Sequence, residues 1–266
     1  MRVILVLLLV VCGCAPRGGG ALHVQDQTVS QVRDAQRERT NAFNELVGRG
    51  VIEFRWEDED GKHKQQGDLD FWKQGNSVSM RISKLGEPIV WLGGGADSYW
   101  FFDLTGDETS LTIGGNDTLF SDIHTSLILL GLEPMPAGEM SIDGEFVTLL
   151  DASGRTWTAN FEPTTSRPLG INVDRGNGRS SALHRTGIRV EIANTLDLFW
   201  PSTGGLIDLE DSHETTKIKI AFSSLSTIVD EEPMDRVFNV KFLRRALKPS
   251  VVIDQTQYRM YPPNSW

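Results

Sequence analysis

The sequence predicts a mainly β (α+β) domain: a curved antiparallel sheet or half-barrel of roughly nine to eleven strands, with an N-terminal helix and one inserted apolar helix. Much of the chain after residue 48 alternates apolar and polar residues with a period of two, which is typical of strands with one buried face. Clusters of Gly, Asn, Asp and Ser separate these stretches and predict turns. One long apolar segment with helical spacing interrupts them near residue 120.

The first expected element is a helix over residues 25–46. Gln, Arg, Glu and Ala dominate this segment, which contains neither Gly nor Pro. A thin apolar stripe predicts that one face of the helix packs on the rest of the domain. The stripe consists of Val29, Val32, Phe43 and Leu46.

Five stretches show the alternation most clearly. One apolar and one polar face favour antiparallel pairing, and the short turns between the stretches favour a meander. A weaker break is expected over residues 195–209, since Trp200-Pro201 does not suit a central strand. The five apolar triplets are Ile52, Phe54 and Trp56; Val78, Met80 and Ile82; Trp157, Ala159 and Phe161; Ile188, Val190 and Ile192; and Ile218, Ile220 and Phe222.

The inserted helix is expected over residues 117–131, with Asn116-Asp117 as its cap and Gly131 at its end. It is more apolar than a surface helix needs to be, so we expect it to lie as a lid on the concave face of the sheet. The space beneath this lid is either a packed core or a ligand cavity. If it is a cavity, the residues expected to bind the ligand are Phe54, Trp56, Leu69, Phe71, Met80, Ile82, Leu119, Ile123 and Leu127.

The N-terminus is typical of an exported precursor. Arg2 precedes nine apolar residues, a run too short to span a bilayer. The following Val11-Cys12-Gly13-Cys14 resembles the bacterial lipobox, which implies removal of residues 1–13 and lipid modification of Cys14. Gly13 favours Cys14 over Cys12, which follows the bulkier Val11. An ordinary secreted protein with two incidental cysteines is the alternative.

The lipobox resemblance sets the expected domain boundaries and location. Residues 14–24 would be the lipidated cysteine and a flexible linker, and residues 25–266 a single domain. In well-studied envelopes an Asp after the lipidated cysteine favours inner-membrane retention. Ala15 stands there in this chain, which implies a protein anchored in the outer membrane and facing the periplasm.

Composition excludes several function classes. Cys12 and Cys14 are the only cysteines, so the mature domain has no intramolecular disulfide, thiol nucleophile or cysteine metal site. The formal net charge of −10 argues against a nucleic-acid partner. Apolar residues interrupt the basic segment from Lys241 to Lys248, which predicts the edge of a strand or helix. No second apolar stretch is long enough to predict a transmembrane helix.

No local motif indicates catalysis or a cofactor, and we expect no catalytic residues, metal or cofactor. The acidic run at residues 57–60 lacks the spacing of an EF-hand and predicts an acidic hairpin tip. Paired carboxylates from distant strands leave no motif, so a periplasmic hydrolase stays open as an alternative. The histidines are scattered without metal spacing and are interpreted as solvated or capped; they are His23, His63, His124, His184 and His213.

Several stretches resemble the LolA/LolB-type lipoprotein carrier and receptor fold. They are Val47–Phe54, Met80–Glu87, Ala96–Asp103, and Phe238–Pro249 followed by Val251-Val252-Ile253, the last matching the final strand of the fold. The resemblance covers most of residues 25–255. It implies a non-enzymatic envelope protein that binds an acyl chain, or the lipid moiety of a lipoprotein, in an apolar half-barrel. This chain is longer than a typical LolB after residue 160, and LolA is a soluble shuttle, so the fold transfers better than the trafficking role.

Leu85 matches the exposed leucine that LolB-like receptors carry in the loop after their third strand. The resemblance implies that this loop meets membrane or cargo; the alternative is a hairpin leucine packed on its neighbours. A structural or scaffolding lipoprotein, with a filled core and a protein partner, is the alternative function. The oligomeric state is left open.

The lipidation hypothesis predicts that Cys14→Ser abolishes incorporation of an alkyne-labelled fatty acid and releases the protein from membranes, because the acylated thiol is lost. Metabolic labelling followed by membrane fractionation measures both effects. Cys12→Ser is the matched control and should be labelled like the parent chain. Labelling that survives in Cys14→Ser would show that the anchor is elsewhere.

Overall fold

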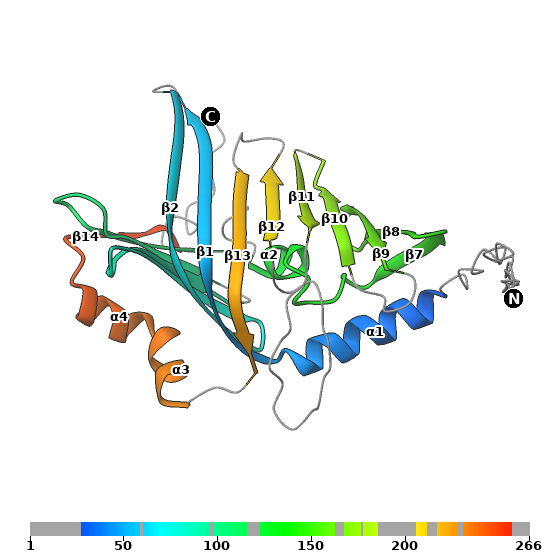
Figure 1. Cartoon of the computed structure of the whole chain (residues 1–266), viewed down its shortest axis with the longest axis horizontal. Helices are drawn as coiled ribbons and strands as arrows, with labels where there is room; N and C mark the ends of the chain where they lie inside the picture. The colour runs from blue at the N-terminus through cyan, green and yellow to red at the C-terminus, as the bar shows by residue number, and fades with distance from the viewer. Residues whose placement is uncertain are drawn as a thin grey trace, which may run out of the picture.

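A computed structural model describes residues 28–58, 61–95, 98–115, 123–162, 168–176, 178–185, 206–211, 217–227 and 231–256. In these parts of the chain, fourteen strands form one curved sheet, and four helices accompany it (Figure 1). The strands are β1 (Glu45–Asp58), β2 (Gly61–Gln74), β3 (Ser77–Lys84), β4 (Glu87–Gly94), β5 (Ser98–Asp103), β6 (Ser110–Gly115), β7 (Gly138–Asp143), β8 (Phe146–Asp151), β9 (Thr156–Phe161), β10 (Pro168–Asp174), β11 (Arg179–His184), β12 (Leu206–Asp211), β13 (Lys217–Ser226) and β14 (Val251–Asp254). The helices are α1 (Val29–Ala42), α2 (Ile123–Leu129), α3 (Glu231–Val237) and α4 (Val240–Leu247).

The sheet consists of two meanders joined side by side. The strand order is β14-β6-β5-β4-β3-β2-β1-β13-β12-β11-β10-β9-β8-β7. All neighbours pair antiparallel except the edge strand β14, which pairs parallel to β6. The chain passes from β6 through α2 to β7 at the opposite edge, and then returns strand by strand until β13 pairs with β1.

The expected mainly β class is confirmed, but the expected nine to eleven strands are too few. Several of the strands that the alternation missed are short, with six residues or fewer, and contain Gly, Asp or Glu. The strand β12 lies partly in the expected break at residues 195–209. Of the segment matched to the final strand, Val251–Ile253 lies in β14, whereas Phe238–Pro249 contains α4, whose buried face follows a helical period. The strand expected at residues 188–192 lies outside the described residues.

Both expected helices are present, and α1 ends at Ala42, four residues before the expected end. The helix α1 starts at a capping box: Thr28 N donates to the Gln31 side chain at 2.8 Å, and Gln31 N donates to Thr28 Oγ1 at 3.3 Å. Leu46, expected on this helix, lies in β1 and is fully buried. Residues 116–122 of the expected lid lie outside the described residues, and α2 begins at Ile123.

The end of α2 is fixed where the sequence predicted it. Gly131 has a φ of 71°, a left-handed conformation that suits glycine. Its N–H donates to Ile128 O, and the N–H of Leu132 donates to Leu127 O, both at 2.8 Å. These two bonds form a Schellman motif, which satisfies carbonyls at the end of the helix.

One face of the sheet, here called the inner face, forms most of the core. In the half around β1, buried residues such as Ile52, Leu69 and Ile220 pack with Leu127 of α2. In the other half, Trp157 and its neighbours on β8–β11 pack with Val32 of α1 and with Ile128. Because Leu127 and Ile128 enter different clusters, α2 connects the two halves of the core.

Glycines let the two meanders approach at their junction. A β-bulge separates Arg49 and Gly50 where β1 pairs with β13. A Cβ atom on Gly50 would lie 2.3 Å from Ala221 O, and one on Gly48 would lie 2.7 Å from Leu225 Cδ2. Larger residues at these positions would push β13 away from β1.

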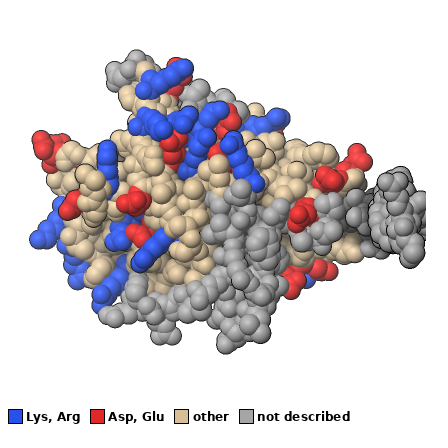
Figure 2. Space-filling view, in the orientation of Figure 1, with Lys and Arg blue, Asp and Glu red and all other residues tan. Residues whose placement is uncertain are grey.

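The opposite, outer face is covered at one end and carries ion pairs elsewhere. The helix α4 places Leu243 against Trp100, Phe102 and Leu111 of β5 and β6. Basic and acidic side chains alternate over β1, β2, β12 and β13 (Figure 2). On this face Lys64 Nζ lies 2.7 Å from the Glu53 carboxylate. Lys64, and to a smaller extent Arg55, hold the pKa of the Glu53 carboxyl below its usual value.

Candidate functional site

The structure places most of the residues predicted to line a ligand space on the inner face. The register sets Leu69 opposite Ile82 and Phe71 opposite Met80. Leu119 lies outside the described residues, and Ile123 begins α2, with its side chain outside the described part of the chain. The residues that come together on the inner face or pack against it are Phe54, Trp56, Leu69, Phe71, Met80, Ile82 and Leu127.

Burial divides these residues into two groups. Leu69, Phe71, Ile82 and Leu127 are at most 2% exposed and belong to the packed core. Phe54 and Met80 are half-buried, and half-buried Trp56 stacks on His63 with 5.0 Å between ring centroids. A ligand can contact the residues of the second group while the buried residues of the first group stay packed in the core.

Half-buried apolar residues on neighbouring strands extend this second group. Ile218 of β13 pairs with Phe54, and Leu92 of β4 pairs with Met80. These side chains pack against the buried cluster and still keep part of their surface accessible. The residues Phe54, Met80, Val90, Leu92 and Ile218 are called the apolar shelf below.

Buried polar contacts hold α2 and the loop after it against α1. The Arg39 guanidinium donates from Nε to Gly131 O, and Met135 N donates to the side-chain oxygen of Gln36 at 3.0 Å. Arg39 is 4% exposed and Gln36 is 7% exposed. Each contact satisfies a backbone group that would otherwise be buried without a partner, so each costs more to break than an exposed hydrogen bond.

A buried ion pair joins the same loop to the sheet. Lys73 Nζ lies 3.0 Å from Glu133 Oε1, with side-chain exposures of 1% and 6%, and it also donates to Phe43 O at 3.0 Å. Removing one partner of such a pair leaves an uncompensated buried charge, at a cost of about 3–5 kcal/mol. The pair therefore fixes the loop after α2 relative to β2 and to the end of α1.

Two more contacts reach α2 from the other half of the sheet. His184 Nε2 lies 3.0 Å from Leu129 O, and Arg155 Nη1 donates to Thr125 Oγ1 at 3.1 Å. His184 and Thr125 are buried. We call the side chains that hold α2 and its loop the clamp; its members are Gln36, Arg39, Lys73, Glu133, Arg155 and His184.

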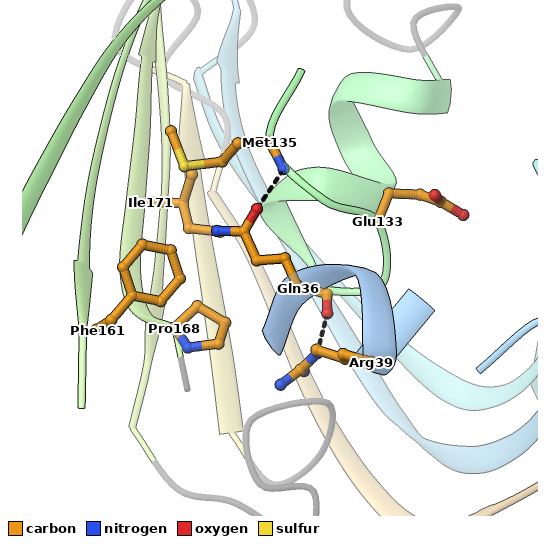
Figure 3. A pocket seen from close by; sticks show the side chains of 8 residues that line it. Gln36, Arg39, Glu133, Met135, Phe161, Pro168 and Ile171 are labelled. Atoms are coloured by element: carbon orange, nitrogen blue, oxygen red, sulfur yellow. Dashed lines mark hydrogen bonds between the residues drawn. The ribbon is translucent and has the colours of Figure 1, made fainter. Parts of the chain in front are cut away.

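A small cavity lies beside the clamp. Its volume is about 10 Å³, enough for about one water molecule. Figure 3 shows Gln36 and Arg39 on the side of α1, and Phe161, Pro168 and Ile171 on the side of the sheet. This cavity cannot hold an acyl chain, since pockets for small ligands measure roughly 300–1,000 Å³.

Leu85 occupies the tip of the β3–β4 hairpin and is 97% exposed. Leu85 and Gly86 have φ angles of 55° and 86° and form a two-residue turn between Lys84 and Glu87. Positive φ at both positions favours Asn-Gly rather than Leu-Gly. Because Leu85 is almost fully exposed, the alternative that it packs on its neighbours is wrong.

An open hollow of about 420 Å³ lies beside Leu85. It is lined by Val51, Lys64, Gln65, Gln66, Gly67, Asp68, Ser83, Lys84 and Leu85.

The clamp was missed by sequence reasoning, although two of its members carry a recognisable signal. Lys73 follows Leu69 and Phe71 at the apolar positions of β2, and Arg39 lies on the buried side of α1 with Val32. A charged residue in the apolar phase of a strand or helix indicates a buried partner. Its partner could not be identified, because Glu133 and Gly131 are distant in the chain.

The described histidines do not form a metal site. His63 stacks on Trp56, His124 is exposed, and His184 belongs to the clamp; His23 and His213 lie outside the described residues. Among the side chains that the structure describes, no three His, Cys, Asp or Glu residues gather around a common point. None of the described helices has the length and hydrophobicity needed to cross a membrane.

No protein-family model matches this chain, and no curated protein matches it in sequence. Among solved structures, the chain is similar to a LolA superfamily protein from Nitrosomonas europaea, with 14% identity, a TM-score of 0.48, and coverage of 81% of this chain and 99% of that one. It is also similar to a domain named as an outer membrane lipoprotein-sorting protein from Vibrio parahaemolyticus, with 11% identity, a TM-score of 0.47, and coverage of 82% and 97%. At these scores, function has to be argued from the residues of this chain.

Proposed function

We propose that this chain is a membrane-anchored, non-enzymatic lipoprotein of the cell envelope, which binds an acyl chain or the lipid moiety of a lipoprotein on its inner face. The apolar shelf carries the proposal. Its side chains border the buried core on the four strands β1, β3, β4 and β13, and part of their apolar surface remains in contact with water. An acyl chain laid along the shelf would remove that surface from water.

The shelf is only partly exposed and the cavity beside the clamp is too small, so α2 would have to move away from the sheet before an acyl chain could be fully buried. Displacement of Leu127 would add Leu69, Phe71 and Ile82 to the surface that the ligand covers. A chain of about 14 methylene groups offers about 11 kcal/mol on burial. That gain would offset part of the contacts that the seven-residue helix and the clamp lose.

The lipid on Cys14 would keep this site close to a membrane. Two or more acyl chains give stable anchoring, whereas one chain gives only marginal binding. Residues 14–24 would then act as a flexible linker that lets the domain reach lipid in the bilayer or in another lipoprotein. The absence of Asp after Cys14, where Ala15 stands, supports an outer-membrane location that faces the periplasm.

Leu85 would be the first contact with membrane or cargo. A leucine gains no packing at this turn, and its left-handed backbone costs roughly 1–2 kcal/mol. Folding therefore does not explain the residue, whereas contact with an apolar partner does. The hollow beside it contributes Val51 and Lys84, an apolar and a cationic group suited to a lipid with a charged headgroup.

A structural or scaffolding lipoprotein with a filled core is the second candidate. The complete burial of Leu69, Phe71, Ile82 and Leu127 favours it, because a permanently closed inner face would look the same. It predicts no lipid ligand and a stable protein partner. A hydrolase is less well supported, since the cavity and the hollow contain one carboxylate each, Glu133 in its ion pair and Asp68.

Acyl-chain binding can be tested with the processed chain, residues 14–266, carrying Cys14→Ser. We expect native mass spectrometry to detect co-purified lipid and the chain to bind a fluorescent fatty acid. Met80→Trp should weaken that binding about tenfold or more, because the larger ring fills the shelf. Thr148→Trp, on the outer face of β8, is the matched control and should bind like the parent. No binding by the parent chain, or equal binding by Met80→Trp with an unchanged unfolding midpoint, would contradict the proposal.

The role of Leu85 predicts opposite effects on stability and on transfer. Leu85→Asn should raise the free energy of unfolding by about 1 kcal/mol, because Asn tolerates the left-handed turn better. It should slow transfer of a fluorescent fatty acid between the protein and vesicles about tenfold, the loss expected when one leucine no longer enters an apolar partner. Leu150→Asn is the control, because Leu150 is also an exposed leucine but lies on β8. Transfer that is equally fast in Leu85→Asn and the parent would refute the role.

A further inference from the structure

The helix α4 presents three distinct sides. Val240, Leu243 and Leu247 face the outer surface of the sheet and pack around Trp100, Phe102 and Leu111. With about 100° per residue, the remaining positions form a cationic arc followed by an exposed apolar arc. The cationic arc consists of Lys241, Arg244, Arg245 and Lys248; the apolar arc consists of Phe242 and Ala246.

The cationic arc is unusual in an acidic chain. All four cations are exposed, and none forms an ion pair with a residue that the structure describes. The acidic residues of the same helical hairpin are Glu231, Glu232 and Asp235, all on α3. Figure 2 shows blue side chains gathered at the end of the molecule that α4 occupies, although the chain as a whole has a formal charge of −10.

Exposed apolar side chains lie close to this arc in the chain. Phe242 is 37% exposed, with the Arg236 guanidinium 5.8 Å from its ring centroid. The edge strand β14 follows within a few residues, and its register with β6 sets Val252, which is 37% exposed, on the face of Leu111 that α4 covers. Val251 and Ile253, both 43% exposed, project to the other face of this edge strand. Cations beside partly exposed aromatic and aliphatic residues are typical of surfaces that rest in the headgroup region of a bilayer.

We propose that α4, together with β14, is a membrane-contact surface that binds anionic phospholipid headgroups. The four cations would lie at headgroup depth, and Phe242 would enter the boundary between headgroups and acyl chains. An acidic protein partner fits less well, because exposed apolar residues lie beside the charges. The surface is on the outer side of the sheet, so the proposal does not rest on acyl-chain binding at the inner face.

The test is sedimentation of the processed chain, residues 14–266 with Cys14→Ser, with vesicles. We expect binding to vesicles of phosphatidylglycerol and phosphatidylcholine, little binding to pure phosphatidylcholine, and loss of binding near 1 M salt, where the Debye length is about 3 Å. Lys241→Glu with Arg245→Glu should reduce the partition coefficient about 30-fold or more, since each cation contributes about 1 kcal/mol at an anionic surface. Phe242→Ser should also weaken binding, with no change in charge.

A matched control separates a local surface from net charge. Arg37→Glu with Lys62→Glu makes the same change in net charge at two exposed cations, one on α1 and one on the β1–β2 hairpin. It should bind vesicles nearly as well as the parent. No preference for anionic vesicles would overturn the proposal, as would an equal loss in the control pair. Binding of an acidic soluble protein without vesicle binding would overturn it too.

Discussion

The ion pair between Lys73 and Glu133 sets how closely α2 can approach the sheet. The loop after α2 carries a buried carboxylate, and only a buried cation on β2 makes that burial tolerable. Arg39 and Gln36 then bond the backbone of the same loop, so the carbonyl of Gly131 and the amide of Met135 have partners where water has little access. A seven-residue helix would hardly be stable alone, and its position depends on these partners.

This constraint explains the unequal halves of the inner face. In the half formed by β7–β11, large side chains such as Trp157 and Phe161 fill the space between the sheet and α1. In the half around β1–β4, a buried centre is bordered by the half-buried apolar shelf. A rigid half can hold the clamp in place while the other half offers surface to a ligand. The glycines at the β1–β13 junction let both halves share one sheet.

Much of the fold could be predicted from local patterns, because its strongest elements carry local signals. Alternation at residues such as Phe54 and Met80 identified the inner face, and Gly131 identified the end of α2. Short strands such as β6 and β7 have too few alternating positions to be recognised, and they form because a neighbouring strand supplies their hydrogen bonds. The clamp joins residues distant in the chain, so sequence reasoning could identify Lys73 as unusual but could not identify Glu133 as its partner.

Hydrogen exchange at the end of α2 tests the central claim, that a ligand displaces this helix from the inner face. The amides of Leu130, Gly131 and Leu132 donate to carbonyls of α2 in the closed form and should exchange slowly. With a saturating fatty acid, the account predicts faster exchange at these amides and unchanged exchange at buried strand residues such as Val173 in β10. Fatty acid that binds while these three amides keep their slow exchange would contradict the account.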